Sequence, residues 1–166
     1  GLVGSEMCIR DRSSEFFTKV NVGIGTPVVG VKDLARSFKE AQTALEVGKV
    51  FDTDKNIVSY DNLGIARLIY HLPTTLCETF LKEVFKKNSI ESLDHETLFT
   101  IQKFFENSLN VSETSRKLFV HRNTLVYRLD KIKKLTGLDL REFDHAIIFK
   151  IALMVKKYLA ANPTKF

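Results

Sequence analysis

Several residue types are scarce in this chain of 166 residues, which contains no Trp, 3 Pro and 2 Cys. Cys8 and Cys77 are too few for a disulfide framework or a thiolate zinc site, so we expect a reducing, cytoplasmic compartment. No stretch has the pattern of a secretory signal peptide. The best candidate for a membrane span, residues 146–155, contains Lys150 and is shorter than the ~20 residues that cross a bilayer. These absences exclude secreted disulfide-rich proteins and membrane proteins.

Acidic residues are outnumbered only in the last third of the chain. The composition, 44% apolar and 27% charged, is that of an ordinary globular protein. Residues 110–166 carry a net charge of +7, whereas residues 1–109 carry −2. A basic region beside a nearly neutral one is typical of a nucleic-acid-binding module joined to another domain. The alternative is an ordinary basic surface, and charge alone does not separate the two.

The first half of the chain predicts a truncated α/β segment over residues 13–87. Residues 1–12 have no helical or strand periodicity, and we expect a non-native or disordered leader there. The predicted elements that follow are a strand from 17 to 24, a helix from 33 to about 48, a short strand over 57–60, and helices over 63–72 and 74–87. Two short strands are too few to form a complete sheet, so we expect this segment to be only half of a domain.

Residues 88–166 predict a compact domain of four helices, over 96–108, 112–119, 122–135 and 143–159. Gly137 lies where a left-handed residue ends the third of them. The last helix is apolar on nearly all sides, which predicts a place in the core or pairing with another copy. The fold class is therefore mainly α, with a helix-turn-helix in a C-terminal four-helix domain that follows a partial α/β segment.

The second and third of these helices have the spacing of a helix-turn-helix. Ser112 is expected to cap the shorter helix, because a Ser hydroxyl readily accepts a hydrogen bond from a backbone N–H in the first turn. On a helical wheel, Leu125, Leu129 and Ile132 form one narrow apolar stripe on the longer helix. This stripe is expected to face the core.

The opposite side of the longer helix carries side chains of the types that bind DNA. In the major groove Arg pairs with guanine, Asn pairs with adenine, and Thr contacts a base edge or a phosphate. We predict that the helix over 122–135 reads the major groove. The candidate base readers are Arg122, Asn123, Thr124, Tyr127 and Arg128, and the residues expected at or near phosphates are Ser112, His121 and Lys131. The alternative is a plain helical hairpin with a solvated basic face.

The same segment resembles a known family of regulators. The likeness is carried by Val-His-Arg-Asn-Thr-Leu-Val-Tyr-Arg-Leu over 120–129, by Asn-Val-Ser-Glu-Thr over 110–114 and by Leu-Thr-Gly-Leu-Asp-Leu over 135–140. These residues resemble the C-terminal DNA-binding domain of the PucR/CdaR-like transcriptional regulators, which act in purine catabolism and sugar-diacid use. Phe119 stands where the broader helix-turn-helix class usually has Gly, and Val126 stands where a basic residue is common.

Upstream, Gly23-Ile24-Gly25 and residues 34–45 resemble the end of the degenerate nucleotide-cyclase-like domain of that family, so the likeness covers roughly residues 18–160. The resemblance implies a sequence-specific regulator that activates a catabolic operon, with double-stranded DNA as its partner. It also implies a small-molecule effector, sensed by an N-terminal domain that this sequence does not include. A homodimer is expected from the nearly apolar last helix.

Enzymatic function has little support in the sequence. Gly23-Ile24-Gly25 lacks the third Gly of a dinucleotide loop and the Lys of a P-loop, and it favours a tight turn. The 4 His are too widely spaced to pair as metal ligands on one helix. Cys77 lies on an apolar helical face and is expected to be a core thiol. We therefore expect no enzyme, no metal and no cofactor; the alternative to DNA binding is a helical protein-interaction or dimerisation module.

Overall fold

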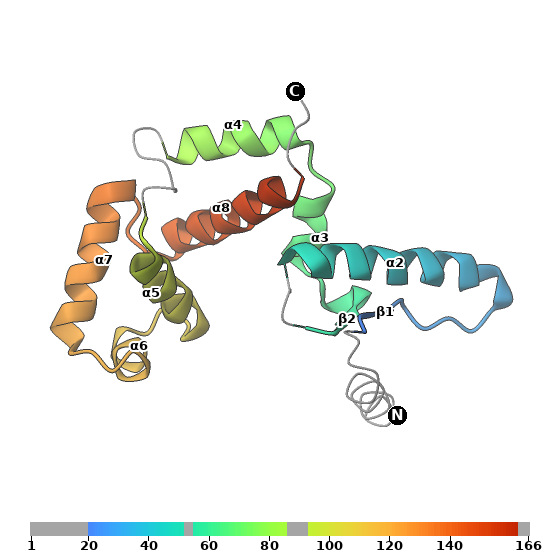
Figure 1. Cartoon of the computed structure of the whole chain (residues 1–166), viewed down its shortest axis with the longest axis horizontal. Helices are drawn as coiled ribbons and strands as arrows, with labels where there is room; N and C mark the ends of the chain where they lie inside the picture. Colours follow the sequence, from blue (N-terminus) through green and yellow to red (C-terminus); the bar gives the residue numbers. More distant parts are fainter. Residues whose placement is uncertain (1–19, 52–54, 86–92, 163–166) are drawn as a thin grey trace. The chain divides into compact units, whose positions relative to one another are not determined.

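The computed structural model describes residues 20–51, 55–85 and 93–162 (Figure 1). Over the described residues the chain divides by its contacts into two compact units. The first comprises residues 20–51, 55–72 and 160–162, and the second comprises residues 73–85 and 93–159. The expected leader and the beginning of the first expected strand lie outside the described residues. The first unit holds the small sheet, and the second unit is helical.

The first unit is built on a two-stranded parallel sheet. Its elements are β1 (Val22–Ile24), the 3-10 helix η1 (Val31–Asp33), α2 (Leu34–Phe51), β2 (Ile57–Ser59), the 3-10 helix η2 (Tyr60–Asn62) and α3 (Ile65–Tyr70). Val22 pairs with Ile57 and Ile24 pairs with Ser59. Parallel neighbours need a crossover connection, and α2 supplies it. A partial α/β segment is thereby confirmed over residues 20–51 and 55–72.

Two glycines, one in β1 and one just after it, allow α2 to pack closely against the sheet. A Cβ at Gly23 would lie 2.2 Å from the carbonyl oxygen of Ala41, and a Cβ at Gly25 would lie 2.0 Å from the carbonyl oxygen of Ser37. No side chain fits at such distances, because the opposing atoms belong to the helix backbone. Gly23-Ile24-Gly25 is therefore a contact between strand and helix, and its interpretation as a tight turn is wrong.

Gly48, near the end of its helix, also allows close packing between α2 and the sheet. The helix is expected to end near this residue, and α2 ends at Phe51. A Cβ at Gly48 would lie 2.7 Å from Cγ2 of Val58 on β2. The missing side chain thus makes room for a buried strand residue, and this tertiary contact outweighs the weak helix propensity of Gly.

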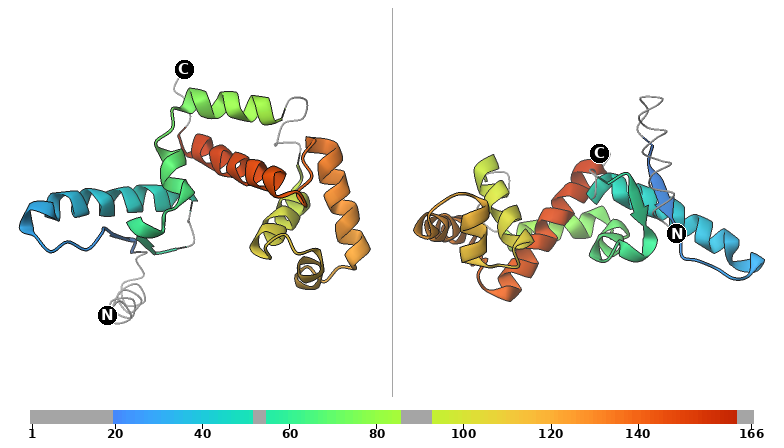
Figure 2. Two further views of the ribbon diagram at one scale, coloured as in Figure 1. Left: turned by 180° about the vertical axis from the view of Figure 1, so that it is seen from behind. Right: turned by 90° about the horizontal axis from the view of Figure 1, so that it is seen from below.

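The second unit consists of helices around one apolar core. Its elements are α4 (Thr74–Val84), α5 (His95–Glu106), α6 (Val111–Lys117), α7 (Arg122–Thr136) and α8 (Phe143–Ala161). The members of the core with 0% exposure are Ile101, Phe104, Leu125, Leu129, Ile132, Leu140, Phe149 and Ala152. Helix α6 follows α5 and leads directly into α7 (Figure 2). The four predicted C-terminal helices are all present, and no end differs from its prediction by more than two residues.

Helix α4 packs with the helical unit, whereas the sequence-based boundary after residue 87 grouped it with the α/β segment. Phe85, at the end of α4, meets Phe149 of α8 edge-on, with ring centroids 5.6 Å apart. Cys77 of α4 is 1% exposed, and burial raises the pKa of its thiol. The division between the units accordingly falls between Leu72 and Pro73. A fragment beginning at residue 88 would lack this part of the core.

The last helix, α8, buries one continuous face. Its buried residues are Ala146, Phe149, Ala152, Val155 and Tyr158. This spacing follows successive helical turns, so α8 lies against the core along most of its length. Within the described ranges, no helix combines the length and the apolar character needed to cross a bilayer.

Candidate nucleic-acid interface

Asn110, and not Ser112, caps α6. The Asn110 Oδ1 accepts a hydrogen bond from the Glu113 N–H at 3.0 Å, so the helix already begins at Val111. The predicted capping role of Ser112 is therefore wrong, because an Asx side chain two residues earlier takes the free N–H of the first turn. The Ser112 hydroxyl instead accepts a hydrogen bond from Nη1 of Arg122 at 3.3 Å. This contact joins the start of α6 to the start of α7.

The turn between α6 and α7 has a left-handed residue that is not glycine. Phe119 has a φ of 55°. The Val120 N–H donates to the Ser115 carbonyl at 3.0 Å, and the Leu118 N–H donates to the Thr114 carbonyl at 2.9 Å, which closes the end of α6. A left-handed backbone is unfavourable for a residue with a Cβ. The Phe119 side chain is 95% exposed, so little packing within this unit offsets that strain.

Replacing Phe119 with glycine is therefore expected to raise the free energy of unfolding by about 0.5–1 kcal/mol. Urea denaturation of the full chain measures this change. Phe119→Ala is the matched control: it removes the same ring but keeps the Cβ, so it should give no gain. A loss of stability in the glycine variant would mean that the Phe119 ring makes a stabilising contact.

Helix α7 begins and packs as its sequence pattern predicts. The His121 Nδ1 accepts a hydrogen bond from the Asn123 N–H at 3.2 Å and caps the helix. Leu125, Leu129 and Ile132 are each 0% exposed, which confirms the apolar stripe. The core thus fixes which side of α7 faces outward.

The outward side near the start of α7 is an open polar surface. Arg122, Asn123 and Thr124 are exposed, and Tyr127 is 71% exposed. These four residues occupy the first two turns, and Ser112 of α6 lies beside them through its hydrogen bond to Arg122. The surface therefore offers a guanidinium, an amide and hydroxyl groups, which are side chains that can form hydrogen bonds with base edges.

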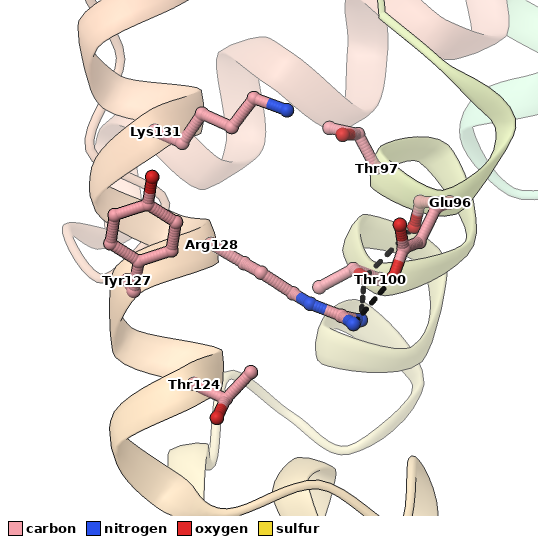
Figure 3. A pocket seen from close by; sticks show the side chains of 7 residues that line it. All are labelled: Glu96, Thr97, Thr100, Thr124, Tyr127, Arg128 and Lys131. Carbon is pink, nitrogen blue, oxygen red and sulfur yellow. Dashed lines mark hydrogen bonds and ion pairs between the residues drawn. The ribbon is translucent and has the colours of Figure 1, made fainter.

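Arg128 points from α7 toward α5, across a pocket of about 230 Å³ (Figure 3). Its Nη1 donates to the Thr100 Oγ1 at 3.2 Å, and its Nη2 is ion-paired with the Glu96 carboxylate. The Arg128 side chain is 27% exposed, less than the other candidate readers. Thr124, Tyr127 and other side chains of both helices complete the lining. Arg128 thus lies beside the open surface but is held by a neighbouring helix.

Lys131 makes a second, weaker link between the same helices. Its Nζ lies 3.6 Å from the Asp94 carboxylate, and both side chains are at least half exposed. Asp94 also caps α5, since its Oδ1 accepts a hydrogen bond from the Thr97 N–H at 2.7 Å. Hydrogen bonds from Thr97 and the charge of Lys131 lower the pKa of the Asp94 carboxyl. The lowered pKa favours the carboxylate form of Asp94, which both the cap and the ion pair use.

The acidic and hydroxyl partners on α5 were not anticipated from the sequence. Glu96 and Arg128 are 32 residues apart, and neither belongs to a motif that names the other. The only hint in the sequence is one of charge: Glu96 is an acid in the first turn of α5, and α7 has a basic face that could attract it. Only the folded arrangement of α5 and α7 turns that signal into a contact.

A second charged cluster fixes the end of α7. The Asp139 side chain is 8% exposed and accepts from Nε and Nη2 of Arg141, at 2.7 and 2.8 Å. Lys133 of α7 lies 3.0 Å from the same carboxylate, and Arg141 also contacts Asp130 of α7 at 2.8 Å. These hydrogen bonds, those from Arg141 foremost, hold the pKa of Asp139 far below its usual range. The segment after α7 is thereby tied back to the helix, and Gly137 makes the turn with a φ of 79°.

No group of three or more His, Cys, Asp or Glu side chains in the described parts of the chain could hold a metal ion. The pocket between α5 and α7 is lined by two cations, one acid, three threonines and a tyrosine. Its chemistry is that of hydrogen bonding and ion pairing at a surface.

The C-terminal unit contains a helix-turn-helix, a class of DNA-binding domain. Its parts are a short helix, a tight left-handed turn and a longer helix with one buried stripe and one open polar side. Residues 97–155 match the PucR C-terminal helix-turn-helix domain, and residues 8–47 match the GGDEF-like domain. Over the region it spans, the chain is similar to the PucR/CdaR-like regulators. The resemblance noted in the sequence is confirmed.

Curated relatives extend this assignment. The chain is 31% identical over 139 residues to the carbohydrate diacid regulator of Escherichia coli (strain K12), covering 82% of this chain and 36% of that protein. It is 26% identical over 149 residues to the purine catabolism regulatory protein of Bacillus subtilis (strain 168), covering 89% of this chain and 28% of the relative. The DNA-binding transcriptional activator AdeR of the same organism is 28% identical over 145 residues, with 82% and 33% covered. The chain thus spans about a third of the length of these relatives.

Proposed function

We propose that this chain carries the DNA-binding part of a transcriptional regulator, which recognises a specific duplex sequence by placing α7 in the major groove. The observation that carries the proposal is the open polar surface on the first two turns of α7, opposite a stripe that is fully buried. The family match over residues 97–155 supports it. The net charge of +7 over residues 110–166 supports attraction to a polyanion.

We assign roles to the exposed residues by their chemistry. Arg122, Asn123 and Thr124 read base edges from the first turn of α7, with Arg directed to guanine and Asn to adenine. Tyr127 contacts a base or sugar one turn later. The remaining candidate residues are Arg128 beside the pocket and, nearer the phosphates, Ser112, His121 and Lys131.

Several properties of the whole regulator follow from its relatives and remain part of the proposal. We propose an activator of a catabolic operon in the bacterial cytoplasm, without enzymatic activity of its own. The names of the relatives, which include regulators of carbohydrate diacid use and of purine catabolism, favour a small metabolite as effector. A homodimer on a site with two-fold symmetry would match the usual geometry of helix-turn-helix proteins.

Selection from a random duplex pool tests the proposal. The full chain is incubated with the pool at two salt concentrations, bound duplexes are sequenced, and the enriched duplex is measured by fluorescence anisotropy. We expect one enriched sequence, and binding that falls with salt at a slope of about −0.9 per phosphate contact. Absence of binding at low salt by a folded chain would overturn the proposal and leave the helical unit as a protein-interaction module.

A further inference from the structure

Glu96 is an acidic residue on the side of the unit that the proposed function turns toward DNA. Its side chain is 68% exposed, and it lies across the pocket from Thr124 and Tyr127 (Figure 3). An acid at such a place repels phosphates, so its presence reduces affinity for any duplex. The contacts of Glu96 within the protein indicate what this loss of affinity is exchanged for.

Glu96 and Thr100 hold the guanidinium of Arg128 from two sides. Glu96 binds Nη2, while the Thr100 Oγ1 accepts from Nη1 at 3.2 Å. Thr100 is itself fixed, since it is 0% exposed and its hydroxyl donates to the Glu96 carbonyl at 2.9 Å. A guanidinium has five N–H donors in one plane, so two such bonds fix its orientation and leave three donors for another acceptor. Arg128 is therefore oriented before any ligand arrives.

We propose that Glu96 is a specificity-determining residue that acts through Arg128. It holds the guanidinium in one orientation, from which the remaining donors recognise an acceptor pair on a base edge, such as O6 and N7 of guanine. Because the side chain is ordered in advance, its rotamer entropy is not lost on binding. The charge of Glu96 meanwhile weakens attraction to the phosphates of every duplex alike, so the discrimination comes from the fixed orientation of Arg128. The inference rests on the proposed function and names one means by which the site discriminates among sequences.

Glu96→Ala in the full chain tests the inference, with Glu106→Ala as matched control. Glu106 ends the same helix, is also exposed, and pairs with Lys103 rather than with α7. Affinity is measured by anisotropy for the selected duplex and for a random duplex. We expect Glu96→Ala to lower the ratio of these affinities about tenfold, as for the loss of one fixed base contact. Affinity for the random duplex should rise about twofold because a repulsive charge is gone, and Glu106→Ala should alter neither quantity.

Two further variants separate orientation from charge. Glu96→Gln removes the charge but keeps an acceptor, so it should raise the affinity for the random duplex as much as Glu96→Ala does while retaining part of the discrimination. Arg128→Lys keeps the charge but loses the planar fork. If Glu96 acts through Arg128, the double variant Glu96→Ala with Arg128→Lys should discriminate no worse than Arg128→Lys alone.

Three outcomes would overturn the inference. If Glu96→Ala raised the affinities for the selected and the random duplex by the same factor, Glu96 would act only as a repulsive charge. Equal losses in both, with a lower melting temperature than Glu106→Ala, would make it a structural residue. Additive effects of the two single changes would separate Glu96 from Arg128. A wild-type chain that prefers no duplex would instead contradict the proposed function itself.

Discussion

Replacing Asp139 with alanine is expected to lower the free energy of unfolding by about 3 kcal/mol at pH 7, because several charge-assisted hydrogen bonds are lost together. Asp139 accepts two hydrogen bonds from the Arg141 side chain and one from Lys133, and its carboxylate is only 8% exposed. No solvent molecule replaces such partners easily at a buried site. Chemical denaturation of the full chain, followed by circular dichroism, gives the difference.

The effect should depend on pH with a definite sign. Because the folded state lowers the pKa of Asp139, the stabilisation is complete above the ordinary pKa of an aspartate, about 3.9. It is lost as the pH falls below that value toward the lowered pKa of the folded protein. Wild type and Asp139→Ala should therefore differ fully at pH 7 and converge in strong acid.

Asp130→Ala is the control for this prediction. Asp130 contacts the same Arg141, at 2.8 Å, but its side chain is 55% exposed. An exposed pair of this kind contributes at most about 1 kcal/mol. Equal destabilisation by the two variants would mean that burial of Asp139 is not what makes its network stabilising.

Replacing Asn123 with alanine should weaken binding to the selected duplex by about 1–3 kcal/mol, or roughly 5- to 150-fold, and relax the preference at one base pair. Asn123 is exposed at the start of α7, where its backbone N–H is taken by the His121 cap. Its side-chain amide makes no hydrogen bond within the described part of the chain. The amide can therefore serve a base edge, with adenine as its best partner.

The measurement is the affinity for the selected duplex and for variants of it at each position. Lys131→Ala is the comparison, since an ammonium near phosphates contributes to all sequences about equally and its loss should reduce the salt slope by about one contact. The assigned docking is wrong if Asn123→Ala weakens every duplex by the same factor, or none.

The helical half of the fold could be predicted from sequence because its signals are local. The stripe of Leu125, Leu129 and Ile132 repeats with the period of a helix, and Gly137 occupies the left-handed position that its lack of a Cβ favours. Phe119 was noted as an unusual residue at the turn, and it proves to be left-handed as well. Each of these features depends on neighbours within one or two turns.

The errors arose where tertiary contacts decide the outcome. Gly48 is expected near the end of its helix, as found, but its close contact with Val58 of β2 does not follow from the local sequence. Ser112 and Asn110 are both good capping residues, and sequence alone did not show which would act first. Cys77 was correctly expected in a core, but helix α4 belongs to the core of the C-terminal unit. Such choices depend on residues far away in the sequence.

The candidate site likewise contains residues that local periodicity places correctly and one whose contacts depend on a distant helix. Residues such as Asn123 and Tyr127 could be placed on the outer side of α7 from periodicity alone, and the structure leaves them exposed. Arg128 has the same local pattern, yet it is bound to Glu96 and Thr100 of α5. The functional roles of these residues remain predictions until binding is measured.

Methylation interference on the selected duplex tests most directly whether α7 lies in the major groove. Methyl groups on guanine N7 project into the major groove, and those on adenine N3 project into the minor groove. We predict that the full chain loses affinity for duplexes methylated at one or two guanine N7 positions in each half-site, and that adenine N3 methylation there has no effect. Interference at adenine N3 alone, or at neither atom, would contradict a reading helix in the major groove.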